Sequence, residues 1–304
     1  MADVQKVRGI GASWIVPTAR LYVRYSPISF LRRFLYWDRL NFASHEYSVR
    51  TRAGVSMAGE SRDFVQGCIY YFGIWEPNLT AFVTRRLNDQ TGRTFVDVGA
   101  NVGYYSLLAA KLMPRGNVVA IEAFPSIYAR LQQNVELNRF TNIRTVPFAA
   151  MESESEVEMF YAGSENEGST TVVPGKYSAT PIRVKGMPLS ELLTEAEIRS
   201  TRLVKIDVEG AEDAVIQGMR AVLPMFEPDA ELVIEIKPAA IGDANTRSMF
   251  DLFDAAGYMP YALTNDYSPS SYLMPGPIAR PGRLLSLPSE QTDVVFSRVN
   301  ADYL

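Results

Sequence analysis

Short apolar runs alternate with stretches of helical periodicity along most of the chain beyond residue 70. The apolar runs are bounded by glycine, proline or polar clusters and predict buried strands, whereas apolar residues at every third or fourth position predict helices. The predicted strands cover residues 94–98, 117–122, 143–148, 203–207, 231–237, 258–263 and 294–299. The predicted helices cover residues 76–87, 104–113, 126–138, 190–200 and 246–256. Strands that alternate with helices in this way predict an α/β fold around a largely parallel sheet.

The regular alternation breaks between residues 151 and 190. Residues 156–161 and 181–185 have the pattern of β segments, and they flank a loop rich in glycine, serine and threonine at 163–171. We interpret this stretch as a β insertion. A proline-rich stretch at 269–288 separates the last two predicted strands and is expected to cover a ligand site.

Residues 94–105 predict a buried strand, a glycine turn and the start of a helix. Gly99 and Gly103 permit the main chain to approach a ligand where a Cβ atom would clash. The turn differs from a dinucleotide-binding loop, because Asn101 replaces the middle glycine and Asp97 precedes the first glycine by two residues. A carboxylate at this place disfavours a pyrophosphate and favours a cation. S-adenosylmethionine carries a sulfonium and an ammonium group, so charge-assisted contacts to Asp97 and Asn101 suit it.

A second carboxylate ends the next predicted strand. Glu122 stands nineteen residues after Gly103 and follows the apolar run 117–121. An acidic residue at this position can accept hydrogen bonds from both ribose hydroxyls. Together the two signals predict a nucleoside pocket rather than a plain turn in an α/β core. An NAD-dependent oxidoreductase is disfavoured, because the turn lacks the middle glycine and the chain has no Tyr-x-x-x-Lys pair.

At these residues the chain resembles the FkbM-type S-adenosylmethionine-dependent methyltransferases. The resemblance covers about residues 70–265 and rests on four ordered blocks, which are Trp75-Glu76-Pro77, residues 95–105, Ile121-Glu122 and residues 204–212. It implies the class I methyltransferase sandwich, with a mixed, mainly parallel seven-stranded sheet. It also implies methyl transfer, usually to oxygen, on sugars and natural products.

The resemblance extends the donor site beyond the glycine turn. It implies that Glu76 lies near the ammonium group of the donor, and the alternative is that Glu76 caps the following helix. Phe124 is expected to flank the adenine ring, with plain core packing as its alternative. The methionine half of the donor is expected to lie among Asp97, Gly99, Asn101 and Gly103, with Glu122 on the ribose.

Asp207 and Glu209 are the leading candidates for the general base. They lie at the carboxyl end of the fourth predicted strand, facing the crevice where open parallel sheets bind ligands. Two neighbouring carboxylates can raise the pKa of one of them, which suits a base near neutral pH. The alternative is that both residues hold the adjoining helix by capping.

Other residues could assist at this edge of the sheet. Glu235, at the end of the next strand, would complete a magnesium site with Asp207 and Glu209, although metal dependence is not the favoured interpretation. His45 is a further candidate base, but a lone histidine is more often structural or exposed. Lys205 lies on the same side of its strand as Asp207 and is expected to pair with an acid.

Composition limits the classes of protein that fit this chain. Its 304 residues are 47% hydrophobic and 21% charged, which is enough for one large domain core. A single cysteine, Cys68, excludes an intramolecular disulfide and a cysteine zinc cluster and fits a reducing cytoplasm. The first eleven residues lack the apolar core of a signal peptide, and no run approaches the roughly 20 apolar residues that span a bilayer. We therefore expect a cytoplasmic enzyme.

Charge is distributed unevenly along the chain. Residues 1–60 hold nine Lys and Arg against four Asp and Glu, whereas the whole chain has a net charge of −4. Residues 14–42 interleave arginines with aromatic residues, a pattern typical of peripheral membrane contact or of packing on a neighbouring surface or in a homo-oligomer. We favour packing. The acidic overall charge and the lack of a recognised motif argue against nucleic acid as a partner.

The sequence therefore predicts two parts. Residues 1–70 form an N-terminal extension, helical and aromatic, that acts as a cap or oligomer contact. Residues 71–304 form the methyltransferase domain, with the 151–190 insertion near the acceptor site. The predicted function is an S-adenosylmethionine-dependent O-methyltransferase that acts on a hydroxyl of a sugar, glycolipid or natural product and releases S-adenosylhomocysteine. The alternative is a non-catalytic module that binds S-adenosylmethionine or another nucleoside within an assembly.

Overall fold

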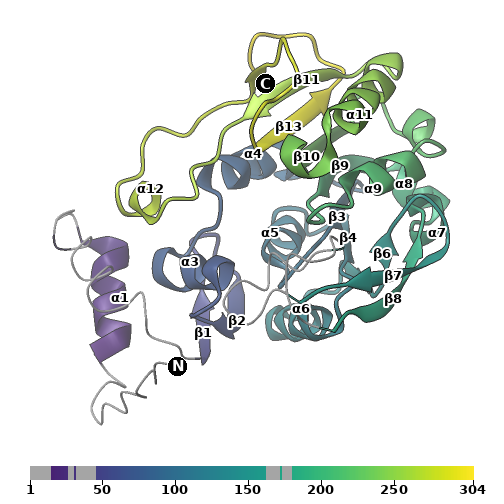
Figure 1. Ribbon diagram of the computed structural model, residues 1–304. Helices are drawn as coiled ribbons and strands as arrows, with labels where there is room; N and C mark the ends of the chain where they lie inside the picture. The colour runs from purple at the N-terminus through teal and green to yellow at the C-terminus, as the bar shows by residue number, and fades with distance from the viewer. Residues whose placement is uncertain (1–14, 27–30, 32–45, 162–171, 173–179) are drawn as a thin grey trace, which may run out of the picture.

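The protein is built around a mixed eight-stranded sheet with helices on both faces (Figure 1). A computed structural model describes residues 15–26, 31, 46–161, 172 and 180–304. Across the sheet the order is β12 (Gly282–Arg283), β11 (Met259–Leu263), β13 (Thr292–Ser297), β10 (Glu231–Ile236), β9 (Thr201–Ile206), β3 (Thr94–Val98), β4 (Asn117–Ile121) and β5 (Ile143–Val146). The five strands from β10 to β5 are parallel, and β13 is antiparallel to both of its neighbours.

This mainly parallel mixed sheet confirms the predicted fold class. The predicted number of seven strands is wrong, because β12 adds an eighth at the edge, where it pairs antiparallel with β11. β12 has only two residues and lies inside the proline-rich stretch, so it has no periodicity of its own to detect.

Alternate residues of the central strands face two different helical layers. Phe95, Leu203 and Val233 pack in one core cluster, whereas their neighbours Val96 and Val204 pack in another. The first layer contains α3 (Phe64–Phe72), α4 (Pro77–Leu87) and α5 (Tyr104–Leu112). The second layer contains α7 (Leu189–Leu192), α8 (Glu195–Arg199), α9 (Glu212–Gly218) and α11 (Asp243–Ala255). Burial on both faces explains why the strands read as continuous apolar runs.

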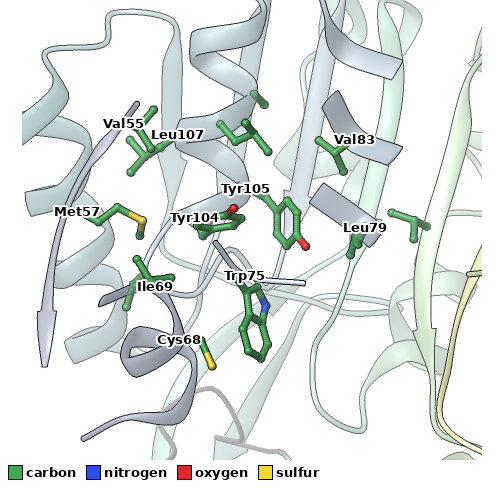
Figure 2. Packing of buried hydrophobic residues seen from close by; sticks show 14 of the residues in the cluster. Val55, Met57, Cys68, Ile69, Trp75, Leu79, Val83, Tyr104, Tyr105 and Leu107 are labelled. Atoms are coloured by element: carbon green, nitrogen blue, oxygen red, sulfur yellow. The ribbon is translucent and has the colours of Figure 1, made fainter. Parts of the chain in front are cut away.

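The core of the first layer lies directly beneath the site described below. Figure 2 shows Trp75 close to Tyr104 and Tyr105 of α5, with Cys68 and Ile69 of α3 beside them. All five side chains are buried. The three aromatic rings therefore pack closely at the start of α5.

One predicted helix, at residues 190–200, is in fact two short helices, α7 and α8. Thr194 interrupts the first and caps the second, because its hydroxyl accepts the backbone N–H of Glu197. The Glu197 carboxylate accepts the backbone N–H of Thr194 in return, which completes a capping box. A capping box begins a helix, so the apolar periodicity across this stretch does not correspond to one continuous helix.

A β-hairpin that the sequence did not predict joins the N-terminal part to the sheet domain. Its strands are β1 (Glu46–Arg50) and β2 (Ser56–Glu60), and β2 lies along α6 (Pro125–Asn138). The side-chain amide of the buried Asn134 accepts the N–H of Ala58 at 2.8 Å and donates to the carbonyls of Ala58 and Val102. Asn138 forms the same two-way pairing with Ser56. Asn134 thereby ties the hairpin to the turn that follows β3.

The predicted β insertion is a separate three-stranded sheet. Its strands are β6 (Ala149–Ala150), β7 (Ser155–Met159) and β8 (Ile182–Met187). β7 pairs antiparallel with β8, and β6 pairs with β8 in parallel. The predicted loop 163–171 lies outside the described residues.

Helix α1 (Ile15–Tyr25) packs against α3. The Arg24 guanidinium donates to the carbonyl of Arg50 at 2.9 Å, and that of Arg20 lies over the Tyr70 ring, whereas Leu21 and Tyr25 are exposed. Most of the predicted basic aromatic segment lies outside the described residues. Within the described part of the chain, every helix is too short or too polar to cross a bilayer.

The proline-rich stretch returns to the first helical layer. It contains α12 (Pro269–Leu273), which contacts α3 in the same core cluster (Figure 1). The Tyr272 ring stacks on Phe72 of α3, with ring centres 5.1 Å apart. A further short helix, α10 (Pro238–Ile241), directly follows β10.

Candidate functional site

The turn between β3 and α5 is shaped by three residues with positive φ angles, Gly99, Asn101 and Gly103. A Cβ atom on Gly99 would lie 1.8 Å from the carbonyl oxygen of Asp207, and one on Gly103 would lie 2.6 Å from Cδ1 of Leu131. The glycines are therefore required for close packing of the turn against the end of β9 and against α6. Gly99 also borders both cavities described below, whereas Gly103 is not among the residues that line either of them.

Glu122 joins the turn to the end of β4. Its Oε2 accepts the backbone N–H of Asn101 at 2.9 Å, and its Oε1 accepts that of Phe124 at 2.8 Å. The side chain is buried, and burial raises the pKa of this carboxyl to about 7, although both backbone hydrogen bonds oppose the shift. The structure thus brings together Asn101, which the sequence assigned to the methionine half of the donor, and Glu122, which it assigned to the ribose.

A narrow cavity of about 70 Å³ lies beside Glu122. Its walls include the apolar side chains of Ile121, Ile127, Phe148 and Met159. The buried carboxylate of Glu122 beside apolar side chains, at the carboxyl end of a parallel sheet, is an environment that suits an aromatic base with an attached ribose.

A larger cavity of about 440 Å³ adjoins the narrow one, since Gly99, Asn101, Asp207 and Glu209 border both. Its aromatic wall consists of Phe64, Trp75, Tyr104, Tyr105 and Tyr267. Its charged residues are Glu76, Lys205, Asp207, Glu209, Glu235 and Lys237. The cavity therefore combines aromatic faces with both signs of charge.

The alternation of the strands explains this concentration of charge. Asp97 of β3 pairs in register with Lys205 of β9, and Glu235 of β10 pairs with Asp293 of β13. Their odd-numbered positions place them on the face that packs against α4 and α5. Four adjacent strands thus carry buried charges on one face near their ends.

Lys205 pairs with an acid, as the sequence predicted, and the structure identifies that acid as Asp207. Its Nζ lies 2.9 Å from Oδ2 of Asp207 and 5.2 Å from the centre of the Tyr105 ring. Burial acts to lower the pKa of Lys205, but the carboxylates of Asp207, Asp97 and Glu76 together raise it. Burial likewise acts to raise the pKa of Asp207, but Lys205 and then Lys237 hold it below its ordinary value. Both groups are therefore charged at neutral pH.

Lys237 lies between the other two carboxylates. Its Nζ is 2.9 Å from Oε1 of Glu209 and 2.6 Å from Oε2 of Glu235. Burial, followed by repulsion from Asp207, raises the pKa of Glu235 to about 9. One oxygen each from Asp207, Glu209 and Glu235 lies within 4.8 Å of the others, so the structure brings together the three residues that would form a magnesium site, the interpretation that the sequence did not favour.

Glu76 precedes these residues by a long stretch of the chain, but it lines the same larger cavity. Its carboxylate accepts hydrogen bonds from the hydroxyls of Tyr105 at 2.7 Å and Tyr267 at 2.9 Å, and burial raises its pKa. The residue has a φ of 41° at the start of α4, and its side chain makes no capping hydrogen bond. The capping alternative for Glu76 is therefore wrong.

Two other predicted donor residues lie behind the cavities rather than in their walls. Asp97 is buried beneath the turn, where its Oδ2 accepts the hydroxyl of Ser106 at 2.6 Å. The Phe124 ring stacks on Tyr161, with ring centres 5.3 Å apart. Neither Asp97 nor Phe124 is among the residues that line the two cavities, so direct donor contact is unsupported and the core-packing alternative fits Phe124.

The turn between β9 and α9 shows which acidic residue makes hydrogen bonds at the start of that helix. The carboxylate of Glu212, the first residue of α9, accepts the backbone N–H of Gly210. Glu212 is fully buried, whereas Asp207 and Glu209 line the cavities. The residue that stabilises this turn is therefore Glu212. The other predicted base, His45, lies outside the described residues.

Comparison with known proteins identifies the family. A sequence model described as the methyltransferase FkbM domain matches residues 97–260, which is more than half of the chain. The chain belongs to this family. Two curated relatives are "Methyltransferase 1" of Beauveria bassiana, 21% identical over 142 residues, and "Methyltransferase sdnD" of Sordaria araneosa, 27% identical over 154 residues. Each match covers 41% of this chain, and 57% and 59% of those proteins respectively.

A solved structure with a similar arrangement is described as the SAM-dependent methyltransferase from Agrobacterium tumefaciens. It is 13% identical, covers 84% of this chain and 70% of its own, and has a TM-score of 0.46. The chain spans less than two thirds of the length of the curated relatives that it matches.

Several residues of the site in this FkbM-family protein were missed by the sequence analysis. Lys237 directly follows β10, and its position at a strand end was the signal that could have found it. Tyr267 and Gln291 line the same cavity from loops that flank the last strands, and nothing in their surroundings marks them. Phe148 follows β5 at the same edge of the sheet as Glu122. Examining every residue that follows a predicted strand would therefore have found site residues that lie outside the motifs.

Proposed function

We propose that this FkbM-family protein is an S-adenosylmethionine-dependent O-methyltransferase that acts on a hydroxyl of a sugar, glycolipid or natural product. The observation that carries the proposal is the pair of adjoining cavities at the carboxyl ends of β3, β4 and β9. The narrow cavity has apolar walls beside the buried Glu122, the larger one has aromatic and charged walls, and Asp207 and Glu209 lie at their shared border. Methyl transfer requires a donor nucleoside and a polar acceptor to bind side by side, and two adjoining cavities permit this.

The residues present fit the donor. Glu122 would hold the ribose hydroxyls, since its carboxylate is fixed by two backbone N–H groups and borders the narrow cavity. Glu76 would hold the ammonium group, because the Tyr105 and Tyr267 hydroxyls keep its carboxylate in the wall of the larger cavity. When bound, S-adenosylmethionine supplies a methyl group that its sulfonium makes electrophilic.

Asp207 and Glu209 are the proposed acceptor-side carboxylates. Asp207 borders both cavities and is ionised, since Lys205 lowers its pKa. It would accept the proton of the acceptor hydroxyl as the oxygen takes up the methyl group, because a carboxylate is too weak a base to remove that proton beforehand. Glu209, held by Lys237, would orient the same hydroxyl. Lys205 and Lys237 fix the two carboxylates in place before the acceptor arrives.

The walls of the larger cavity favour a polar acceptor with apolar faces. Trp75 and Tyr267 present neighbouring rings, with centres 5.8 Å apart, and Phe64 meets Trp75 edge to face. Aromatic rings beside hydrogen-bonding carboxylates and lysines suit a sugar ring or a hydroxylated natural product. The single cysteine is consistent with a cytoplasmic reaction.

Calorimetric titration of S-adenosylhomocysteine tests the donor site before any acceptor is known. We expect low-micromolar binding to the wild type, at least tenfold weaker binding to Glu122→Ala, and no heat from NAD. Glu136→Ala, on the exposed side of α6, is the matched control and should bind as the wild type does. A folded protein that binds NAD, or that binds neither ligand, would refute the proposed donor.

A labelled methyl donor and a panel of sugars, glycolipids and polyketides then test the reaction. We expect Asp207→Asn and Glu209→Gln to lose turnover while they retain affinity for S-adenosylhomocysteine. Unchanged turnover in both variants would overturn their proposed roles. Donor binding by the wild type with no product across the panel would favour the non-catalytic module instead.

A further inference from the structure

Lys237 occupies the position in the carboxylate triad where a bound cation would lie. The triad consists of Asp207, Glu209 and Glu235, and one oxygen of each lies within 4.8 Å of the others. The Nζ atom of Lys237 contacts two of the three, at 2.9 Å from Glu209 and 2.6 Å from Glu235. Carboxylates gathered this closely and shielded from water require a nearby positive charge.

We propose that the ammonium group of Lys237 is the resident cation of this triad and holds Glu209 and Glu235 where a divalent metal ion would otherwise hold them. The wild-type protein then takes no divalent cation at the triad. Removal of the ammonium group leaves a set of oxygen ligands that a hard divalent cation can occupy. This inference does not depend on the proposed methyl transfer.

The charge at the site supports this assignment. Cation binding requires the triad in its fully ionised form, which carries three negative charges against the two positive charges of Lys205 and Lys237. Loss of Lys237 would raise the uncompensated charge from −1 to −2, and one divalent ion would bring it to zero. A divalent ion added to the wild type would instead leave a net positive charge and would compete with an ammonium group already in hydrogen-bonding contact.

The main chain fixes Lys237 in this place. It is the single residue between β10 and α10, and Pro238 begins the helix directly after it. Its side chain is only 19% exposed. The strand before it and the proline after it restrict its backbone, and the two carboxylate contacts of the largely buried side chain hold the ammonium group in the triad. Lys237 is therefore a positioning residue for the two carboxylates.

The test is Mn²⁺ binding, which needs neither donor nor acceptor. Calorimetry and electron paramagnetic resonance of bound Mn²⁺ should detect no site in the wild type or in Lys237→Arg, which keeps the charge. Lys237→Met removes the charge at similar length and should bind one Mn²⁺ with a dissociation constant at least tenfold below the weakest binding that the wild-type titration could detect. Adding Glu209→Gln to Lys237→Met should abolish that binding. Lys185→Met, at an exposed lysine, should behave as the wild type.

Two outcomes would overturn the proposal. One is a wild-type protein that binds Mn²⁺ with an affinity that Glu209→Gln weakens, because the triad would then be a metal site in the presence of Lys237. The other is a folded Lys237→Met that binds no Mn²⁺. If Lys237→Met folds only when Mn²⁺ is added, the ion has replaced the lysine and the proposal is supported. The comparison of the wild type with Glu209→Gln does not depend on whether Lys237→Met folds.

Discussion

Substitution of Gly99 by alanine is expected to lower the stability of the protein and to weaken donor binding, because the new side chain would clash with one backbone carbonyl group. Gly99 has a φ of 77°, and the new Cβ atom would lie 1.8 Å from the carbonyl oxygen of Asp207, whereas real Cβ atoms essentially never approach closer than 3.0 Å. The carbonyl belongs to the main chain at the end of β9 and cannot rotate away as a side chain could. The strand end itself must move.

The expected loss combines two contributions. The left-handed backbone costs an alanine roughly 1–2 kcal/mol, and forcing apart packed backbone in an interior typically costs about 1–3 kcal/mol more. Gly257 provides a matched control, because it has a φ of 80° with no atom within 4 Å of an added Cβ. Gly257→Ala therefore carries only the first contribution, and Gly99→Ala carries both.

Urea unfolding of the wild type and the two variants measures the difference. We expect Gly257→Ala to lose about 1 kcal/mol of unfolding free energy and Gly99→Ala about 2 kcal/mol more. Titration of S-adenosylhomocysteine should show weaker binding only in Gly99→Ala, because the displaced carbonyl belongs to a residue that lines both cavities. Equal losses of stability in the two variants would refute the argument that close approach to Asp207 requires this glycine.

Three further predictions follow from the buried charges. Glu122 has a pKa raised by burial to about 7, so its ionisation opposes folding; between pH 4.5 and pH 8 the stability of the wild type, measured by urea unfolding, should fall by about 3 kcal/mol more than that of Glu122→Gln. Lys205→Met leaves the ionised Asp207 without its partner and should lower the free energy of unfolding by about 3–5 kcal/mol at pH 7. The wild type loses the stabilisation that comes with the lowered pKa of Asp207 as the pH falls through that pKa, so the difference in unfolding free energy between the wild type and the variant should shrink in acid, and a constant difference would contradict the pairing. Tyr267→Phe removes the hydroxyl that binds Glu76 and should lose about 1 kcal/mol in thermal unfolding, whereas the exposed Tyr303→Phe should lose none, and equal effects would contradict this role.

The sequence by itself determined most of the sheet and the neighbourhood of the site. Apolar periodicity reports burial locally, so the buried strands such as β3 and β10 were predicted within two residues of their ends. The same periodicity identified α5 and α6 within one residue. Because the carboxyl ends of parallel strands meet at one edge of the sheet, the sequence also predicted that Glu122 and Asp207 lie in one site. The hairpin at 46–60 escaped detection because its alternation is short and its strands mix polar with small residues.

Only the tertiary structure decided what each charged or glycine residue contacts. Gly103 meets Leu131 of α6, and Glu76 binds a tyrosine 191 residues away, and no local pattern encodes either partner. The position of Lys237 at a strand end places it near the site, but only the tertiary structure shows that two carboxylates converge on it. The physical reason is that burial is a property of each segment and appears in its own composition. Pairing between buried polar groups depends instead on how distant segments are positioned, which the composition of neither segment contains.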